Sequence, residues 1–341
     1  MKILVTGAAG FIGFYLVEAL IKKGEHVVGI DNINDYYDVN LKYARLSESG
    51  IDLEKADDKE NGLEYVASTK YENYRFLKLD ITDLNALDTL FKNENFNGVI
   101  NLAAQAGVRY SIENPHAYIQ SNVVGFLNIL ECCRSYKIDH LIYASSSSVY
   151  GDRSQIPFSE NEKVDTPVSL YAATKKSNEL MAHTYTHLYD IPTTGLRFFT
   201  VYGPWGRPDM APMLFADAIS KGQPINVFNN GKMQRDFTYI DDIVEGVVQL
   251  ALQFKKDKAP KAEVFNIGNS QPVKLMDFIG GLEKEMGEEA TKNYMPMQDG
   301  DVKVTYADAS KLHKETGYKP TTTLEAGLHK FINWYKSFYN Y

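Results

Sequence analysis

Three glycines directly after the first apolar run place the strongest constraint on how this chain folds. Residues 2–6 predict a buried strand, and Gly7, Gly10 and Gly13 follow it where a helical pattern begins. Glycines permit a tight turn and a close approach of the backbone to a pyrophosphate, whose charge a helix N-terminus stabilises. A glycine triplet alone is weak evidence, but a strand before it and a helix after it are typical of a dinucleotide-binding βαβ unit.

Apolar runs and amphipathic stretches alternate through the first two-thirds of the chain. Buried strands are predicted at residues 2–6, 26–30, 74–79, 98–102, 141–144 and 193–198. Helical spacing marks residues 11–23, 85–93, 115–136 and 170–189. This alternation predicts right-handed crossovers and an α/β fold with a doubly wound, parallel Rossmann sheet.

Two parts of the chain depart from this alternation. Residues 47–73 are polar, charged and weakly periodic, so we expect an insertion between the second and third strands. Beyond about Pro204 the turns are richer in Gly and Pro, which predicts a smaller α/β domain interleaved with the first. We expect an NAD-binding Rossmann domain over residues 1–197, with part of 238–268 returning to it, and a substrate-binding domain over 198–341.

Composition and charge argue against several classes of protein. The chain has 36 Lys and Arg against 44 Asp and Glu, a net charge of -8, whereas a non-specific nucleic-acid binder needs a basic face. No run reaches the ~18 apolar residues that span a bilayer, and the start lacks a signal-peptide pattern. The adjacent Cys132 and Cys133 do not suggest a disulfide framework. We expect a cytoplasmic protein without nucleic-acid, membrane or metal partners.

An acidic residue at the end of the second predicted strand indicates which dinucleotide binds. Asp31, followed by Asn32, comes about 20 residues after the glycines. A carboxylate there accepts hydrogen bonds from an adenosine ribose and repels a 2′-phosphate. The sequence therefore predicts NAD rather than NADP, with a helix cap or a turn as the alternative role for Asp31.

A tyrosine and a lysine four residues apart are the candidate reactive pair. Tyr171 and Lys175 share one face of the predicted helix 170–189. A nearby cation, aided by a positive nicotinamide, should lower the pKa of the tyrosine so that it acts as a base near neutrality. In a chain with 23 tyrosines a surface pair is the alternative, but the serine run 145–148 just before it supports the catalytic interpretation.

Together these motifs resemble the extended short-chain dehydrogenase/reductase family. The resemblance rests on the Gly-x-x-Gly-x-x-Gly spacing, Asp80-Ile81, the segment 101–104 and Tyr171-x-x-x-Lys175. It implies cofactor contacts along the carboxyl ends of the strands. The implied NAD-binding residues are Gly7, Gly10, Phe11, Ile12, Gly13, Asp31, Asn32, Asp80, Ile81, Leu102, Ala103, Ala104, Ala144, Ser145, Tyr171, Lys175 and Phe198.

The same resemblance divides the serine run into roles. It gives Ser146 the hydrogen bond to the reacting hydroxyl, so the implied catalytic residues are Tyr171, Lys175 and Ser146. Sugar-nucleotide dehydratases have Asp-Glu at the next two positions, and UDP-xylose-forming decarboxylases have Glu at the second. Ser147 and Ser148 stand there in this chain and have no acid/base capacity near neutral pH. Oxidation without elimination favours epimerisation of a UDP-sugar.

Residues 31–38 and 197–211 resemble the UDP-glucuronate 4-epimerase branch of the family. Arg207 is suited to a C6 carboxylate, with pairing to Asp209 as the alternative. UDP-galactose 4-epimerases typically have Asn where Thr200 stands, and commonly Arg where Gln298 stands. The implied substrate-binding residues are Arg109, Ser146, Ser147, Ser148, Tyr171, Thr200, Arg207, Val227, Phe228, Arg235, Gln298 and Asp301.

Other functions stay open at this point. A 4-epimerase of a neutral sugar nucleotide shares the same reactive residues, and a net NAD-dependent oxidoreductase shares the cofactor site. A binding protein that has lost activity is a third alternative, which the intact Ser146, Tyr171 and Lys175 disfavour. Family members commonly pair through two helices, so the resemblance implies a homodimer formed by residues 115–136 and 170–189. Asn122, at the start of the first, is either a ligand contact or a satisfied core residue.

Overall fold

The computed structural model describes residues 1–54, 58–60, 62–253, 261–298 and 300–341. Within these ranges the largest element is a nine-stranded sheet with the order β12-β8-β7-β6-β1-β2-β5-β4-β3. From β12 to β5 the strands are parallel, and β4 and β3 extend the edge in antiparallel fashion. In sheet order the strands are Ala262–Ile267, Thr193–Phe198, His140–Ser146, Gly98–Asn101, Lys2–Thr6, His26–Asp31, Tyr74–Lys78, Leu63–Ala67 and Asp58–Glu60.

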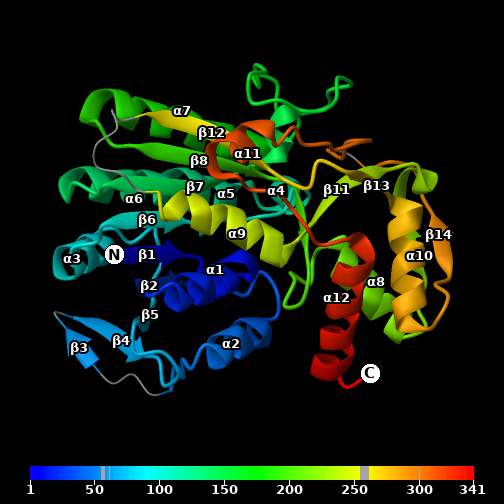
Figure 1. Ribbon diagram of the computed structural model, residues 1–341, viewed down its shortest axis with the longest axis horizontal. Coiled ribbons are helices and arrows are strands. Elements are labelled where there is room, and N and C mark those ends of the chain that lie inside the picture. The colour runs from blue at the N-terminus through cyan, green and yellow to red at the C-terminus, as the bar shows by residue number, and fades with distance from the viewer. Residues whose placement is uncertain (55–57, 61, 254–260, 299) are drawn as a thin grey trace.

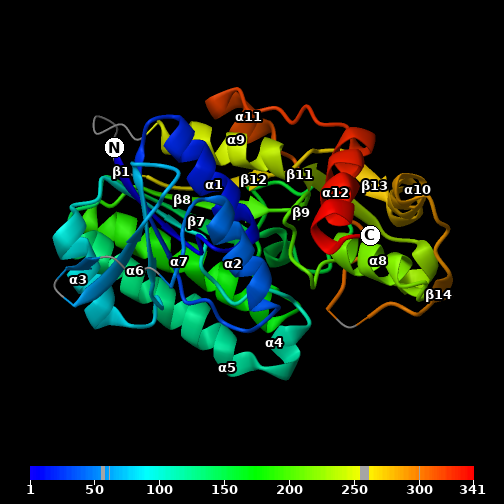
Figure 2. The ribbon, with the colours of Figure 1, turned by 90° about the horizontal axis from the view of Figure 1, so that it is seen from below.

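Helices cover both faces of this sheet. Figure 2 shows α1 and α9 on one side of the strands and α3, α6 and α7 on the other. These helices are Phe11–Lys22, Ile240–Ala251, Leu84–Glu94, Gly125–Ser135 and Leu170–Tyr189. The central strands carry apolar side chains on both faces because helices bury each face: Leu4 packs in one core cluster, and Ile3 and Val5 pack in the other. The doubly wound parallel sheet predicted from the sequence is confirmed.

The strand order places the first glycine turn at the point where the topology reverses. From β1 the chain proceeds outward to β2 and β5 on one side, and then to β6, β7 and β8 on the other. In open α/β sheets, ligands bind outside the carboxyl ends of the strands at such a switch point. The loops after β1, β6 and β7 therefore meet at one edge.

A second lobe follows β8 and lies to the right in Figure 1. It contains a three-stranded sheet of β9 (Thr200–Tyr202), β11 (Gln234–Tyr239) and β13 (Pro272–Lys274), and a parallel pair of β10 (Ile225–Val227) and β14 (Lys292–Tyr294). Its helices are α8 (Ala211–Ser220), α10 (Leu275–Met286) and α12 (Leu324–Tyr339), whereas α11 (Ser310–Thr316) packs on β12 and α9 of the first lobe. Between β11 and β13 the chain returns to the first lobe, where α9 packs on α1 and β12 pairs with β8.

In two places the structure adds detail to the sequence-based prediction. The predicted insertion at 47–73 includes residues 55–57 and 61, which lie outside the described ranges, but its described part forms the β3–β4 hairpin on the sheet edge. Before it, α2 (Val39–Glu48) is capped by Asp38, whose side chain accepts a hydrogen bond from the amide of Asn40. The returning segment 238–268 likewise includes residues 254–260, outside the described ranges.

The single helix predicted at 115–136 is also divided. It begins as α5 (Pro115–Tyr118), passes through a π-helical segment, η1 (Ile119–Val124), and continues as α6. A preceding short helix, α4 (Tyr110–Glu113), connects it to the loop after β6. The π-helical segment contains the buried Asn122, and such segments are frequent at functional sites.

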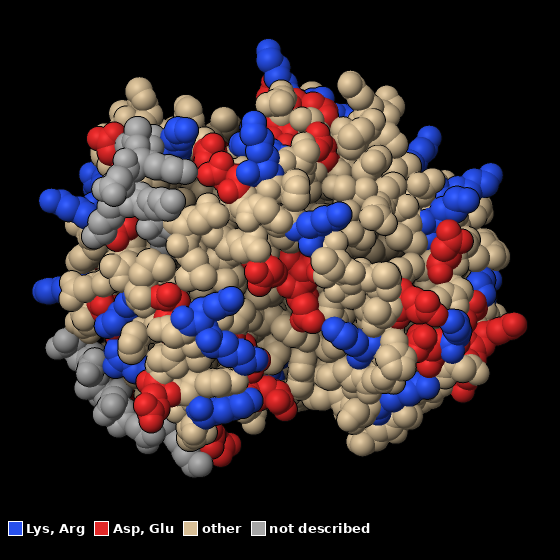
Figure 3. Space-filling model, viewed as in Figure 1, with Lys and Arg blue, Asp and Glu red and all other residues tan. Residues whose placement is uncertain are grey.

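The surface mixes both signs of charge. On the face shown in Figure 3, acidic and basic side chains are interspersed among larger uncharged areas. Among the described residues, no helix is both long enough and apolar enough to cross a bilayer.

Candidate active site

A cavity of about 410 Å³ lies between the carboxyl ends of the parallel strands and the second lobe. Residues from both lobes line it, from the first glycine turn to the segment after β14. Most of the predicted site residues are among them: Gly7, Gly10, Phe11, Ile12, Gly13, Asp31, Asn32, Asp80, Ile81, Leu102, Ala103, Ala104, Ala144, Ser145, Ser146, Ser147, Ser148, Tyr171, Lys175, Phe198, Thr200, Arg207, Arg235 and Asp301.

The glycine turn is sterically closed to larger residues. Gly7 has φ +71°, and a Cβ there would lie 2.9 Å from the amide nitrogen of Ala103. A Cβ on Gly13 would lie 2.1 Å from the carbonyl oxygen of Gly7. Thr6 fixes the neighbouring loop, because its hydroxyl donates to Asn101 Oδ1 at 2.7 Å and accepts the Ala103 amide at 3.0 Å. The start of α1 therefore faces the cavity as bare backbone, which suits a pyrophosphate.

Two aspartates form the end of the cavity beside β2. Asp31 is 8% exposed, and its Oδ1 accepts the amide of Ile33 at 2.8 Å. Asp80 Oδ2 accepts a hydrogen bond from the side-chain amide of Asn32 at 2.8 Å. Burial opposes the charge of Asp80, but hydrogen bonds from Asn32 and Thr82 outweigh it and hold its pKa below the usual range. Both groups therefore face the cavity as acceptors for hydroxyls.

Lys42 lies beside these aspartates and was missed by the sequence reasoning. Its ammonium is 3.6 Å from Asp31 Oδ1, and its side chain is almost fully buried. Burial lowers the pKa of Lys42, although Asp31 opposes that shift. Little in the sequence indicated this pair, because Asp31 ends a strand and Lys42 lies in the next helix, so no regular spacing relates them.

The candidate reactive pair occupies the first turns of α7. Ser169 caps this helix by accepting the amide of Ala172 at 3.1 Å. Lys175 is 3% exposed, and its ammonium donates to the carbonyl oxygen of Ala144 at 2.9 Å. The Lys175 nitrogen lies 5.9 Å from the centre of the Tyr171 ring. Burial lowers the pKa of Lys175 to about 8.

In the protein by itself, the pKa of Tyr171 is raised rather than lowered. Burial disfavours the phenolate, while hydrogen bonding with Ser146 and the charge of Arg207 oppose the rise. The expected shift of this pKa toward neutrality therefore needs a further positive charge in the cavity. The cation that acts on the phenol from the protein side is Arg207, on a loop far from Lys175 in the sequence.

The four serines divide between two sides of the strand end. Ser145 is 2% exposed, and its hydroxyl donates to Glu179 Oε1 at 2.7 Å, beneath the cavity. Ser146 Oγ accepts hydrogen bonds from the amide of Ser148 at 3.2 Å and from its hydroxyl at 2.9 Å. The short helix η2 (Ser147–Tyr150) begins there, so Ser147 and Ser148 line the same cavity as Tyr171.

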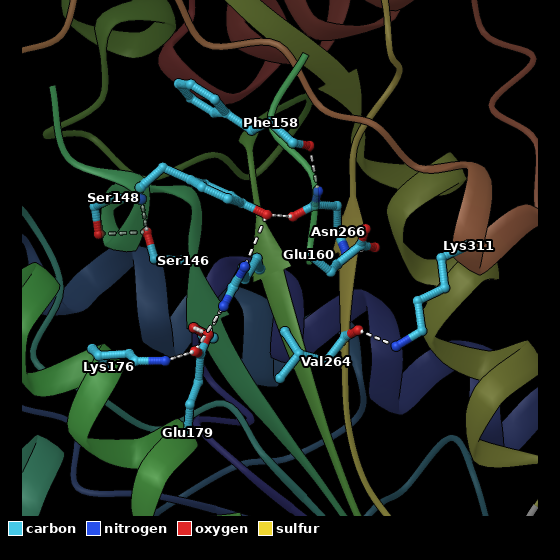
Figure 4. Close-up of polar contacts among 12 residues, drawn as sticks. Ser146, Ser148, Phe158, Glu160, Lys176, Glu179, Val264, Asn266 and Lys311 are labelled. Atoms are coloured by element: carbon cyan, nitrogen blue, oxygen red, sulfur yellow. Dashed lines mark hydrogen bonds and ion pairs between the residues drawn. The ribbon is translucent and has the colours of Figure 1, made fainter. Parts of the chain in front are cut away.

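A buried polar network supports this strand end from below (Figure 4). Arg197 donates to both carboxylate oxygens of Glu179, at 2.8 and 2.9 Å, and to the hydroxyl of Tyr150 at 2.9 Å. Tyr150 in turn donates to Asn266 Oδ1 at 2.7 Å. The network joins α7, β8, η2 and β12, and through Ser145 it reaches the end of β7. It was not predicted, although Glu179 follows Lys175 by one helical turn.

Asn122 has the structural role that the sequence left as one of two alternatives. Its Oδ1 accepts the amide of Gln105 at 2.8 Å, and its Nδ2 donates to the Gln105 carbonyl and to Thr174 Oγ1, each at 3.0 Å. Its carbonyl accepts a hydrogen bond from Asn178 at 2.6 Å. These contacts hold the loop after β6 against α7, so the side chain is fully used within the protein.

The far end of the site contains two arginines. Arg109 pairs with Asp301 at 3.2 Å, and its guanidinium lies 5.0 Å from the ring centre of Phe228. Arg235 donates to the carbonyl oxygens of Gln234 and Lys303 at 2.9 and 3.3 Å. Burial lowers the pKa of Arg235, and the charge of Arg109 adds to the effect. Arg235 lines this end of the cavity and Arg109 lies outside the lining, beside Asp301; two cations in this region suit a diphosphate.

Four predicted substrate residues lie outside the cavity lining: Arg109, Val227, Phe228 and Gln298. Val227 is fully buried, and its carbonyl oxygen accepts the amide of Met295 at 3.0 Å, so its backbone is partly used within the protein. Gln298 Oε1 is buried and, among the described residues, has no hydrogen-bond partner. The described residues contain no group of three or more His, Cys, Asp or Glu side chains arranged to hold a metal ion.

Arg207 lines the cavity and is already paired. Its Nε donates to Asp209 Oδ1 at 3.0 Å, and its Nη2 donates to Asp209 Oδ2 at 2.5 Å. Burial disfavours the guanidinium charge, but Asp209 outweighs this and raises the pKa of Arg207. The pairing that the sequence left as an alternative is therefore present, in a position that also faces Tyr171.

Residues 3–268 match the model of the NAD dependent epimerase/dehydratase family. The chain belongs to this family. "Protein CapI" of Staphylococcus aureus is 52% identical over 99% of both chains. UDP-glucuronate 4-epimerase 4 of Arabidopsis thaliana is 47% identical over all of this chain and 76% of that protein. A crystal structure of UDP-glucuronic acid 4-epimerase from Bacillus cereus, in complex with UDP-glucuronic acid and NAD, superposes with a TM-score of 0.87 at 37% identity, over 99% of this chain and 100% of that chain.

Proposed function

We propose that this protein is a UDP-glucuronate 4-epimerase, which interconverts UDP-glucuronate and UDP-galacturonate through a transient 4-keto sugar. One observation supports the reaction most directly: Ser147, Ser148 and Arg207 line the same cavity as Tyr171. The two serines stand where dehydratases have carboxylates, the second of them where decarboxylases have Glu, and the arginine is suited to a uronate. The names of the relatives support the same substrate.

Three residues would move or hold the reacting proton. Tyr171 is the base that takes the proton of the sugar 4-hydroxyl, and Ser146 orients that hydroxyl by a hydrogen bond. Lys175, fixed by the carbonyl of Ala144, binds the nicotinamide ribose and contributes a positive charge to the site. Because burial holds the proton on Tyr171 in the protein alone, the base forms only once a positively charged group is bound nearby.

The cavity fits a resident NAD. The glycine turn offers amides where any side chain would clash, and Asp31 and Asp80 offer acceptors for the adenosine end. Bound NAD would supply an acceptor for the hydride from C4 of the sugar, and its reduced form would supply a hydride to the opposite face, so no net redox change would occur. Asp31 would exclude a 2′-phosphate and favour NAD over NADP.

The remaining residues would bind the UDP-sugar. Thr200, Ser147, Ser148 and Arg207 line the same cavity and would surround the C6 carboxylate. At the other end, Arg235 and Asp301 would meet the diphosphate and the ribose, with Arg109 beside them. For Val227, Phe228 and Gln298, contact with the uridine stays a prediction, since they lie outside the cavity lining.

Incubation of the purified protein with UDP-glucuronate, without added NAD, tests the proposal. NMR spectra should show UDP-galacturonate approaching equilibrium with the substrate, with no lasting absorbance change at 340 nm. A stoichiometric rise at 340 nm would instead show a net oxidoreductase, and conversion of only UDP-glucose or UDP-GlcNAc would show a neutral-sugar epimerase.

Arg207 separates the uronate substrate from a neutral one. Arg207→Ala should reduce turnover of UDP-glucuronate far more than any turnover of UDP-glucose, because the neutral sugar has no carboxylate for the guanidinium to bind. Thr200→Ala is the matched control: it removes one uncharged contact from the same cavity. Equal losses of Arg207→Ala on both sugars would contradict the carboxylate assignment.

We also propose that the protein is a homodimer formed through residues 115–136 (α5, η1 and α6) and 170–189 (α7). Leu127, Leu180 and Leu188 on these helices are 39%, 57% and 58% exposed, which is a large apolar exposure for two neighbouring helices. Light scattering after size exclusion should give about twice the chain mass of 38.5 kDa. A monomeric mass at micromolar concentration would refute the dimer.

The domain division at 197/198, with part of 238–268 returning to the first domain, is likewise proposed. Support comes from the positions of α9 on α1 and of β12 beside β8. A cytoplasmic location also stays a proposal, which localisation of the tagged protein in its own cell would test.

A further inference from the structure

The loop that contains Arg207 is held from the cofactor side of the cavity. Arg45, on α2, is fully buried and donates to the carbonyl oxygen of Trp205 at 3.2 and 2.7 Å. The hydroxyl of Tyr36 donates to Asp209 Oδ2 at 3.1 Å. Two separate contacts therefore fix this loop on either side of Arg207. Both come from the segment that begins at the proposed ribose ligand Asp31.

Tyr36 is itself firmly placed: its hydroxyl donates to Asp209, and its oxygen also interacts with Arg207. Its ring packs against that of Tyr110, with centroids 4.8 Å apart. Gly107 passes so close that a Cβ there would lie 2.6 Å from the Tyr36 oxygen. Burial and the Asp209 carboxylate raise the pKa of Tyr36 to about 12. The phenol therefore keeps its proton at physiological pH and directs it to Asp209.

The pairing with Asp209 uses one particular edge of the guanidinium. Both hydrogen bonds to Asp209 come from Nε and Nη2. A guanidinium has a second edge, formed by Nη1 and Nη2, that matches a carboxylate equally well. With Asp209 fixed on the first edge, the second edge remains for a substrate carboxylate. Tyr36 sets its direction through Asp209 and through its own interaction with Arg207.

We propose that Tyr36 and Asp209 are positioning residues that present this second edge of Arg207 to the C6 carboxylate of a UDP-uronate, and so favour epimerisation over loss of CO₂. The inference rests on the proposed function, because it requires a uronate that is oxidised at C4. It assigns a role to the Tyr36 segment, which the sequence comparison singled out without giving it one.

The chemistry explains why orientation matters. Oxidation at C4 makes the substrate a β-keto acid, while the two electrons removed pass to the bound NAD. In the side reaction the C5–C6 bond breaks, CO₂ leaves, its bonding pair forms an enolate with the C4 carbonyl, and C5 then takes a proton. This cleavage requires the C5–C6 bond to stand parallel to the carbonyl π system. A carboxylate held by a fixed guanidinium edge resists the rotation that achieves this alignment.

Two variants and one matched control test the inference. Tyr36→Phe removes the hydroxyl and keeps the ring, and Asp209→Asn removes the carboxylate charge and keeps the side-chain size. Tyr110→Phe removes a hydroxyl from the ring packed on Tyr36; that hydroxyl accepts from Asn114 and does not contact Asp209. For each protein, NMR gives the ratio of UDP-galacturonate to UDP-4-keto-pentose, and calorimetry gives the Kd values of UDP-glucuronate and UDP-xylose.

The proportion of turnovers that end in the keto pentose should rise about fivefold in Tyr36→Phe, because the loss of one ordinary hydrogen bond changes such a ratio by about that factor. It should rise about tenfold or more in Asp209→Asn, which loses charge-assisted bonds. Tyr110→Phe should match the wild type. The Kd of UDP-xylose, which lacks C6, should be the same in all four proteins. If the Kd of UDP-xylose stays the same while the products from UDP-glucuronate change, the variants have lost the positioning of the carboxylate and not the structure of the site.

Two results would overturn the inference: an unchanged product ratio in both variants, or an equal rise in Tyr110→Phe. The proposed function is tested separately by the wild type. If the wild type does not epimerise UDP-glucuronate, the proposed function fails. If it does and the product ratios stay unchanged, only the positioning role fails.

Discussion

The ion pair of Glu179 and Arg197 gives the sharpest prediction for stability. The two side chains are 4% and 3% exposed, and both carboxylate oxygens accept from the guanidinium. Breaking one partner of a buried pair costs about 3–5 kcal/mol, because the other charge is left uncompensated. Glu179→Gln keeps the shape and the acceptor for Ser145, so we expect the lower end, about 3 kcal/mol.

This cost converts to a modest thermal shift in a chain of this size. An unfolding entropy of about 2.1 cal/mol/K per residue, over 341 residues, gives about 0.7 kcal/mol/K. A loss of about 3 kcal/mol therefore lowers the melting temperature by about 4 °C. Urea unfolding followed by circular dichroism measures the free energy directly, and kcat should fall with it because Ser145 and α7 share the network.

The effect should depend on pH with a definite sign. Burial opposes the charge of Glu179, but hydrogen bonds and the charge of Arg197 outweigh it, so its pKa in the folded protein lies below the ordinary value. A carboxyl with a depressed pKa stabilises the fold above its unfolded-state pKa and loses that contribution as pH falls through the folded one. The difference between wild type and Glu179→Gln should therefore be full at neutral pH and shrink below about pH 4.

Glu325→Gln is the matched control, since it removes a carboxylate from an exposed pair with Lys284. Exposed pairs contribute little, so this variant should unfold like the wild type. The reasoning is refuted if Glu179→Gln is as stable as Glu325→Gln at neutral pH, or if its deficit persists unchanged in acid.

Two further changes test the chemistry and the cofactor site. Tyr171→Phe should lower kcat by about 10²–10⁴-fold while leaving the Kd of UDP-glucuronate unchanged, because only the proton transfer is lost; full turnover would remove Tyr171 from the mechanism. Gly13→Ala would place a Cβ 2.1 Å from the Gly7 carbonyl oxygen, so the purified protein should retain less NAD, as measured by chromatography of the released nucleotide. Normal retention in that variant would show that the turn is not the pyrophosphate site.

Much of the fold was predictable because its signals are local. The strands that are buried on both faces are nearly continuous apolar runs, and the glycine turn has a steric cause that the sequence displays. The β3–β4 hairpin was missed because it pairs only at an edge and needs little apolar surface. The division of residues 115–136 was missed because the π-helical segment is fixed by the contacts of Asn122 with Gln105 and Thr174, which are distant in sequence.

In the candidate site, too, the features with local sequence signals were predictable and those that depend on distant segments were not. Residues close to a motif, such as Tyr171, Lys175 and the glycines, were placed in the cavity by the fold as expected. The pKa of Tyr171 was not predictable, since it depends on burial and on Arg207 from another loop. Likewise the pairs Tyr36–Asp209 and Arg109–Asp301 join segments more than 150 residues apart, so no local pattern could indicate them.

The return of the chain to the first lobe has a consequence for synthesis and folding. β12 is the last strand of the large sheet, and its Asn266 accepts the hydroxyl of Tyr150, which lies more than 100 residues earlier. On the ribosome, β8 stays an unpaired edge and the Arg197 network stays incomplete until Ile267 has emerged. We therefore expect a fragment ending at residue 197 to aggregate rather than fold. Most of the first lobe precedes the second in the chain, but the first lobe needs β12 from the later part, so the two lobes cannot be produced as independent proteins.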